Sequence, residues 1–328
     1  MQSSNYQHTT VKVYHGFGHM HLLTLYGHVQ HNRFNTERNY NNNILSNIIH
    51  LVKLFCVVPV AGGRLRLLWN EQQFFATTGD DGFFKFEWSS IAEVPAGWHG
   101  LAVQLLDDAG NTVKTGQGEI FVPHSTQFGF ISDIDDTVMV SHSATIFRRL
   151  RVLFTRNPKT RKAFTTVRKH YLLLSEAHTT PDVPNPFFYV SSSEWNLYDD
   201  LTAFFDYNHL PKGAFLLSQV KQWFQLFTTG KTKHEGKLLR IYRILQAFPR
   251  QQFVLLGDNS QADPDIYAEI ALKYPKQIFA VYIRNIVTDN GPGTREILQK
   301  IERQKIFTCL FSDNEAAIAH SRNIGLIK

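Results

Sequence analysis

Cysteine is scarce in this sequence. The chain of 328 residues has two, Cys56 and Cys309, and they lie in opposite halves. A disulfide framework is therefore not expected, and free buried thiols in a reducing compartment are the simpler interpretation. The opening residues, MQSSNYQHTT, are polar and lack the basic, apolar and small-residue regions of a secretory signal peptide. Together these absences predict a cytoplasmic location.

A long hydrophobic run is also missing. The longest apolar stretch, residues 44–58, is shorter than the roughly 20 residues that a membrane-spanning helix needs. Its polar residues Asn47, His50 and Lys53 are three positions apart and so share one helix face. The stretch predicts an amphipathic helix packed on a domain, with no transmembrane segment. Attachment of this helix to a membrane surface, as in a peripheral membrane protein, is the alternative.

Basic residues exceed acidic ones, which gives a formal net charge of +6. Such a surface favours anionic partners, but charge alone does not choose among phosphate esters, acidic lipids and nucleic acids. A nucleotide-binding P-loop is not indicated, because the GKT at 230–232 has Gln225 where the motif needs glycine. We expect no nucleic-acid partner. His19 and His21 could form a metal pair on one strand face, but with 15 histidines in the chain coincidence is the better explanation.

The first part of the chain has the pattern of an all-β domain. Short strand patterns separated by turn sequences occur at 9–29 (two strands around a turn at Gly16 and Gly18), 64–69, 83–88, 101–106 and 116–123. A strand about every ten residues is typical of a β-sandwich. We predict a sandwich-like domain over residues 1–124, with the 44–58 helix and an Asn-rich connector at 30–43.

The remaining part, residues 125–328, has the pattern of an α/β domain. Near-continuous apolar runs alternate with helical stretches and lie at 128–133, 187–192, 213–218, 253–258, 278–283 and 305–311. Runs of this kind predict a parallel sheet that is covered by helices on both faces. Ligands of such sheets bind at the carboxyl ends of the strands, so the residues that follow each run are the candidate site.

A basic segment separates the first two runs. Residues 138–186 predict a helical insertion, and positions 145–170 hold nine Lys or Arg and no acid. The cations either form a solvated helix face or form a lid that attracts a phosphate ester or an anionic lipid. Near an anionic surface each cation adds about 1 kcal/mol. Arg148 and Arg149 are the substrate-binding candidates in this segment.

Acids, a serine and a lysine follow the apolar runs. The pieces are DIDDT (133–137), Ser191, Lys237 near the start of a helix, and GDNSQAD (257–263). A helix cap alone does not need two alternating acids. Converging carboxylates require a hard cation, and Mg²⁺ prefers oxygen ligands. One carboxylate can then attack phosphorus while its neighbour protonates the leaving oxygen, and a hydroxyl and an ammonium can hold the phosphoryl oxygens.

These four pieces, in this order, resemble the haloacid dehalogenase (HAD) phosphatase superfamily. Within it, the chain is similar to the actin-patch-associated phosphatidate phosphatase catalytic domains in the stretches ISDIDDTV, FYVSSSEWNLYDDL, GKLLRIYRILQAFP and LLGDNSQADPDIY. The likeness covers about 125–328, and the sequence before it resembles the β-rich leader of prokaryote-type members. The resemblance implies a HAD-like Rossmannoid fold, a magnesium-dependent phosphomonoester hydrolase with an aspartyl-phosphate intermediate, and phosphatidate or a related lipid phosphate as substrate.

The resemblance also implies roles for the acids. Asp133 would be the nucleophile and Asp135 the general acid/base. Asp258 would complete the magnesium site with Asp133 and the backbone carbonyl of Asp135, and Asp263 would orient Lys237 or the waters on the metal. Asp136 receives no catalytic role, and we expect it to be a local structural residue.

The remaining roles concern substrate binding. Ser191 and Lys237 would grip the phosphoryl group. Because three serines stand in a row, Ser192 is the alternative to Ser191, and Lys231 and Lys233 compete with Lys237. Thr137, together with the two arginines of the basic segment, completes the substrate-binding candidates.

At three places the chain departs from the family pattern. Glu194 stands where the family usually has proline, Gly236 where it has histidine before the motif lysine, and Ser218-Gln219 where it has an Arg-Asp pair. These departures affect substrate contacts more than the chemistry. A soluble phosphate ester or a phosphoprotein is therefore the alternative substrate, and a membrane- or protein-binding module with vestigial activity is the alternative function.

Overall fold

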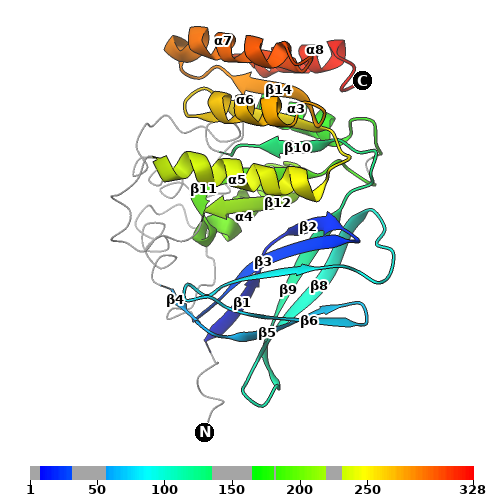
Figure 1. Cartoon of the computed structure of the whole chain (residues 1–328), viewed down its shortest axis with the longest axis vertical. Coiled ribbons are helices and arrows are strands. Elements are labelled where there is room, and N and C mark those ends of the chain that lie inside the picture. Colours follow the sequence, from blue (N-terminus) through cyan, green and yellow to red (C-terminus); the bar gives the residue numbers. More distant parts are fainter. Residues whose placement is uncertain (1–7, 32–56, 135–164, 181, 219–230) are drawn as a thin grey trace. The chain divides into compact units, whose positions relative to one another are not determined.

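The computed structural model describes residues 8–31, 57–134, 165–180, 182–218 and 231–328 (Figure 1). The chain divides into two compact units, Met1–His124 and Ser125–Lys328. Strands make up the regular structure of the described part of the first unit, and strands alternate with helices in the second. Each unit is described by itself.

In the described part of the first unit, nine strands form one sheet. They are β1 (Thr9–Val13), β2 (Gly16–His19), β3 (Leu22–His31), β4 (Val58–Pro59), β5 (Arg64–Trp69), β6 (Gln72–Thr77), β7 (Phe83–Trp88), β8 (Gly97–Leu106) and β9 (Thr112–Val122). Their order is β1-β3-β2-β9-β8-β5-β6, and β4 and β7 also pair with β3. Strands β5 and β7 bury every second residue, as expected for a sheet with one face in the core. The sandwich arrangement stays a prediction.

One turn prediction in this unit is wrong. Residues 9–29 hold parts of three strands, and the chain turns at Met20 and His21 rather than at Gly16 and Gly18. Both glycines lie inside β2 instead. A Cβ at Gly16 would approach the backbone oxygen of Thr24 to 2.6 Å, so glycine is required there because β3 lies so close. Strand β6 was also not predicted.

The described residues of the second unit form a parallel sheet of six strands with helices between them, which confirms the α/β prediction. The strands are β10 (Gly129–Ser132), β11 (Phe187–Glu194), β12 (Gly213–Ser218), β13 (Phe253–Asp258), β14 (Ile278–Arg284) and β15 (Phe307–Phe311). Their order is β12-β11-β10-β13-β14-β15, and each neighbouring pair is parallel. The central strands β10 and β13 are buried along their whole length, which explains their unbroken apolar sequence.

Helices cover this sheet. They are α3 (Thr165–Ser175), α4 (Tyr198–Tyr207), α5 (Lys231–Ala247), α6 (Asp263–Lys273), α7 (Gly291–Glu302) and α8 (Asn314–Asn323), with short 3₁₀ turns η3 (Trp195–Leu197) and η5 (Thr288–Asn290). Helix α6 contacts both α5 and α7, and α3 contacts α8. Right-handed connections place α3 and α4 on the face opposite to α5, α6 and α7. Figure 1 shows α5 and α6 in front of the strands.

The order of the strands creates a switch point between β10 and β13. From β10 the chain proceeds to β11 and β12, and it then returns to β13 on the other side of β10. Ser132 pairs with Leu256, and the N–H of Asp133 donates to the carbonyl of Leu256 at 2.9 Å. Two neighbouring strands therefore end side by side at the edge where ligands of such sheets bind.

Helix α3 braces the strand that leads into this edge. Its buried residues share one face of the helix and are Val167, His170, Tyr171, Leu174 and Ser175. The Nε2 of His170 lies 3.0 Å from the Oγ of Ser321 in α8, and the hydroxyl of Tyr171 lies 2.8 Å from the Oγ of Ser132. The C-terminal helix, α3 and the end of β10 are thus connected through buried polar contacts.

Several predicted features lie outside the described residues. They include most of the 44–58 helix, whose residue Val58 instead begins β4, and the basic segment up to residue 164. Among the helices that the structure describes, none has the length and apolarity to cross a bilayer. Cys309 in β15 is a free thiol, and burial raises its pKa to about 11; Cys56 lies outside the described residues.

Candidate active site and metal centre

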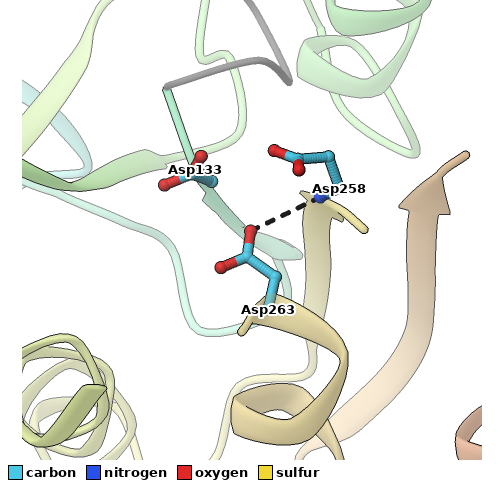
Figure 2. A group of neighbouring side chains, drawn as sticks. All are labelled: Asp133, Asp258 and Asp263. Atoms are coloured by element: carbon cyan, nitrogen blue, oxygen red, sulfur yellow. Dashed lines mark hydrogen bonds between the residues drawn. The ribbon is translucent and has the colours of Figure 1, made fainter. Parts of the chain in front are cut away.

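Three buried carboxylates gather at the switch point. Asp133 follows β10, Asp258 ends β13 and Asp263 begins α6 (Figure 2). One carboxylate oxygen of each lies within 4.8 Å of the others. Within the described ranges, this is the only group of three or more His, Cys, Asp or Glu side chains arranged so that it could hold a metal ion. Asp258 and Asp263 come 125 and 130 residues after Asp133 in the sequence, but the fold brings all three together.

A buried lysine from α5 joins two of these acids. The Nζ of Lys237 donates to Oδ1 of Asp133 at 2.7 Å and to Oδ1 of Asp263. Burial by itself would lower the pKa of Lys237, but the two carboxylates outweigh it and raise the pKa above its usual value. The ammonium therefore stays charged at neutral pH. The side chains of the competing Lys231 and Lys233 lie outside the described part of the chain.

Local backbone structure explains the place of Asp263. It lies in the first turn of α6, where the positive end of the helix dipole favours an acid. Its Oδ2 accepts from the N–H of Asp258 at 3.4 Å, the contact drawn in Figure 2. Gly257 leaves room for this arrangement: a Cβ there would lie 2.5 Å from Oδ2 of Asp263 and 2.7 Å from Cε2 of Tyr267. Steric crowding therefore explains why glycine occupies position 257 in the GDNSQAD stretch.

The charges of the cluster suit a divalent cation. Three carboxylates face one ammonium, which leaves a surplus of two negative charges in a buried site. Burial, followed by the charge of Asp263, raises the pKa of Asp258 to about 6, although a hydrogen bond from the N–H of Ser260 partly opposes this. An all-oxygen donor set and a twofold negative surplus fit Mg²⁺. We find the residues compatible with a magnesium site.

The serine cluster lies at an irregularity in β11. The pairing of β11 with β12 shifts between Val190 and Glu194, as in a β-bulge, a feature that re-aims side chains near active sites. Ser191 is buried, its Oγ accepts from the N–H of Ser193 at 2.9 Å, and its carbonyl oxygen accepts from Arg240 at 3.3 Å. Ser192 is half-buried. Both serines remain candidates for the phosphoryl-binding hydroxyl.

Sequence reasoning missed Arg240. It lies three positions after Lys237 in α5, and residues at that spacing share a helix face. Burial, followed by the charge of Arg243, lowers the pKa of Arg240 to about 10, while Asp133 acts in the opposite direction. The guanidinium thus remains a cation next to the acidic cluster. The spacing of three positions from Lys237 was the feature of the sequence that could have indicated Arg240.

Asn259 was missed as well. Its Nδ2 donates to Oδ1 of Asn285 at 2.6 Å and to the carbonyl of Val287 at 2.9 Å. Its Oδ1 accepts from the N–H of Ile286 at 2.7 Å and from that of Val287 at 3.0 Å. The residue that follows Asp258 therefore fixes the loop after β14. Because its partners lie 26–28 positions away in the sequence, no local pattern indicated this role.

Several predicted site residues lie outside the described residues. They are Asp135, Thr137, Arg148 and Arg149. Asp136, expected to be structural, and Gln219, part of one departure from the family pattern, also lie outside the described residues. The other two departures from the family pattern are placed: Glu194 is the last residue of β11, and Gly236 lies in α5 directly before the lysine. His19 and His21 are close, with ring centroids 5.8 Å apart, and Nδ1 of His19 accepts from the N–H of His21 at 3.2 Å.

Comparison with known families agrees with the motifs. Residues 128–285 match the family model for the catalytic domain of phosphatidate phosphatase APP1. This confirms the predicted resemblance. The phosphatidate phosphatase APP1 of Saccharomyces cerevisiae is 30% identical over 182 residues, 53% of this chain and 29% of that protein. An uncharacterized protein of Schizosaccharomyces pombe is 26% identical over 179 residues, 54% of this chain and 28% of its own length.

The chain thus spans less than a third of the length of these curated relatives. Among solved structures, a carbohydrate acetylesterase from Xanthomonas citri aligns with 96% of this chain and 73% of its own, at 10% identity and a TM-score of 0.35. A likeness at that level does not indicate a common activity.

We predict that Gly257→Ala disturbs the site, because the new methyl group would overlap Asp263 and Tyr267. The free energy of unfolding should fall by about 1–3 kcal/mol, and magnesium should stabilise the variant less than the wild type. Thermal or urea unfolding with and without Mg²⁺ measures both. Gly236→Ala is the control, since the nearest atom to its Cβ is 3.7 Å away. Unchanged unfolding of Gly257→Ala would contradict the steric argument.

We also predict a pH dependence of stability in the metal-free protein. The pKa of Asp258 is raised in the folded state from 3.8 to about 6, so folded protein binds this proton more tightly than unfolded chain. Stability contributed by Asp258 should therefore fall as pH rises from about 4 to about 6. Urea unfolding across that range should show a smaller decline in Asp258→Asn. An equal decline in both proteins would mean that another group is responsible.

Proposed function

We propose that the second unit is a magnesium-dependent phosphomonoester hydrolase with a HAD-like Rossmannoid fold. The observation that carries the proposal is the gathering of Asp133, Asp258 and Asp263 around Lys237 at the switch point of a parallel sheet. The match of residues 128–285 to a phosphatidate phosphatase catalytic domain supports it independently.

In the proposed reaction, a carboxylate oxygen of Asp133 attacks the phosphorus of the ester. The bond between Asp133 and phosphorus forms as the ester P–O bond breaks, and Asp135 gives its proton to the leaving oxygen. A water molecule, deprotonated by Asp135, then attacks the same phosphorus and releases phosphate and the carboxylate of Asp133. The role of Asp135 rests on the sequence, because that residue lies outside the described part of the chain.

The other residues of the site would bind the metal ion, position the ammonium of Lys237 and donate to the phosphoryl oxygens. Asp133, Asp258 and Asp263 would bind Mg²⁺, which supplies positive charge to the phosphoryl oxygens when bound. Lys237 donates to Asp133, and its second bond to Asp263 keeps the ammonium beside the nucleophile. A hydroxyl from Ser191 or Ser192 would donate to a phosphoryl oxygen. Each element that carries one of these groups belongs to the second unit.

For the substrate we propose phosphatidate or a related lipid phosphate. The family match and the net charge of +6, which favours anionic surfaces, support this class. A cytoplasmic protein that can associate peripherally with a membrane would fit such a substrate. The rival function, a binding module with vestigial chemistry, is not favoured, since the three buried acids keep a surplus of negative charge after Lys237 pairs with two of them.

The replacement Asp133→Asn tests the nucleophile. It should lower the rate of magnesium-dependent phosphate release at least about 1,000-fold, because the amide cannot form the phosphoenzyme. Phosphate release from para-nitrophenyl phosphate and phosphatidate, with Mg²⁺ or with EDTA, is the measurement. Asp265→Asn, an exposed acid two positions after Asp263, should keep full activity. Wild-type turnover in Asp133→Asn would exclude Asp133 as the nucleophile.

A substrate panel tests the lipid assignment. Phosphatidate in mixed micelles should give a higher kcat/KM than glycerol phosphate, sugar phosphates or phosphopeptides. Sedimentation with acidic liposomes should be the same for the wild type and Asp133→Asn, since surface binding does not need the nucleophile. Turnover of soluble esters alone, with no sedimentation, would contradict the lipid substrate. Sedimentation without turnover of any ester would favour the binding module.

A further inference from the structure

One cation beside the acidic cluster has no task in the reaction described above. The Nη2 of Arg240 donates to the carbonyl of Ser191 at 3.3 Å. Its Nε is buried and has no hydrogen-bond partner among the described residues. Guanidinium carries five N–H donors, and a buried donor without a partner costs about 1–3 kcal/mol. A ligand that accepts hydrogen bonds at this position would remove that cost.

Lys237 alone cannot satisfy a phosphate. An ammonium has three donors, and two of those on Lys237 are engaged by Asp133 and Asp263. A divalent ion would cancel the surplus charge of the carboxylates, but a phosphate monoester brings about −1.5 to −2 further charges at pH 7. The site therefore needs a second cation on the side of the substrate. Arg240, which donates to the carbonyl of the candidate phosphoryl-binding Ser191 at 3.3 Å, is the cation placed to serve.

On one side the guanidinium of Arg240 faces a glycine rather than a larger side chain. A Cβ on Gly236 would lie 3.7 Å from Nη1 and 3.9 Å from Nη2 of Arg240, so the guanidinium lies against bare helix backbone. On its other side is the end of β11 with Ser191. A planar guanidinium held in this way can offer its Nε and one Nη to the same anion, the paired geometry that suits phosphate oxygens.

We propose that Arg240 is a second phosphate-binding residue of the site. Its Nε and Nη groups contact non-bridging oxygens of the phosphate and favour dianionic monoesters over monoanionic diesters. As a substrate-binding role this rests on the proposed function, whereas the binding of phosphate itself does not. The alternative is a structural role, in which the guanidinium only joins α5 to β11 through the Ser191 carbonyl.

Titration with inorganic phosphate in the presence of Mg²⁺ tests the proposal without turnover. By calorimetry, Arg240→Gln should bind phosphate about 10-fold more weakly or worse, the effect of losing one charge-assisted hydrogen bond. Arg243→Gln is the matched control, because Arg243 is an exposed arginine one turn further along the same helix. Its affinity should equal that of the wild type. Equal affinity in Arg240→Gln, or no phosphate binding by the wild type, would overturn the proposal.

Kinetics separate substrate binding from a structural role. For a phosphate monoester, Arg240→Gln should raise KM about 10-fold, with thermal stability close to that of the wild type. A lowered Tm with an unchanged KM would show that Arg240 only joins α5 to β11, and it would contradict the proposal. If Arg240→Gln does not fold, Gly236→Leu keeps the arginine and fills the space beside the guanidinium, with Gly236→Ala as its control. Gly236→Leu should show the same loss of phosphate affinity, and wild-type affinity would contradict the proposal.

The outcomes also distinguish this proposal from the proposed reaction. Asp133→Asn lacks the nucleophile, but it should still bind phosphate through Arg240. Phosphate binding that depends on Arg240, without turnover of any ester by the wild type, would contradict only the reaction. Turnover together with phosphate affinity and KM that do not depend on Arg240 would contradict only the role of Arg240.

Discussion

The candidate site depends on the double ion pair of Lys237. Three buried carboxylates within 4.8 Å of one another would repel strongly in a medium of low dielectric constant. The ammonium between Asp133 and Asp263 removes part of that repulsion and fixes the helix that carries it against two other elements. The remaining surplus of negative charge suits the cluster to a cation and distinguishes it from a closed salt-bridge network. The same group of three carboxylates and one ammonium therefore holds the elements together and provides the charge that would attract a cation.

The strand order explains how these carboxylates come to lie so close together. Because β10 and β13 are neighbours although α3, β11, α4, β12 and α5 lie between them in sequence, Asp133 and Asp258 leave the sheet side by side. Neither strand can shift easily, since both are buried along their whole length. The contact of Tyr171 with Ser132 and that of Asn259 with the loop after β14 hold the two strand ends from outside. Rigid elements on both sides keep the acids close despite their repulsion.

The sequence predicted the parts of the site that depend on strand ends. Unbroken apolar runs followed by acids are enough to place Asp133 and Asp258 at one edge, because a parallel sheet brings its carboxyl ends together. Lys237 was a candidate from its place near the start of a helix, and the resemblance to a phosphatase family added a role for Asp263; the structure brings both into the cluster. In the first unit, by contrast, the glycines at 16 and 18 were mistaken for a turn. Glycine marks close backbone approach as well as turns, and only the neighbouring strand distinguishes the two.

Arg240 shows why the rest could not be predicted. Periodicity places it on the same face of α5 as Lys237, but many helix arginines at that spacing lie in solvent. What makes this one different is the tertiary context: the end of β11 meets it at the Ser191 carbonyl, and a Cβ at Gly236 would come no closer than 3.7 Å to its guanidinium. A small residue before the lysine and a cation three positions after it therefore form one feature. The departure at Gly236, which taken alone suggests a lost substrate contact, is compatible with the proposed contact of Arg240, because no side chain at position 236 lies beside the guanidinium.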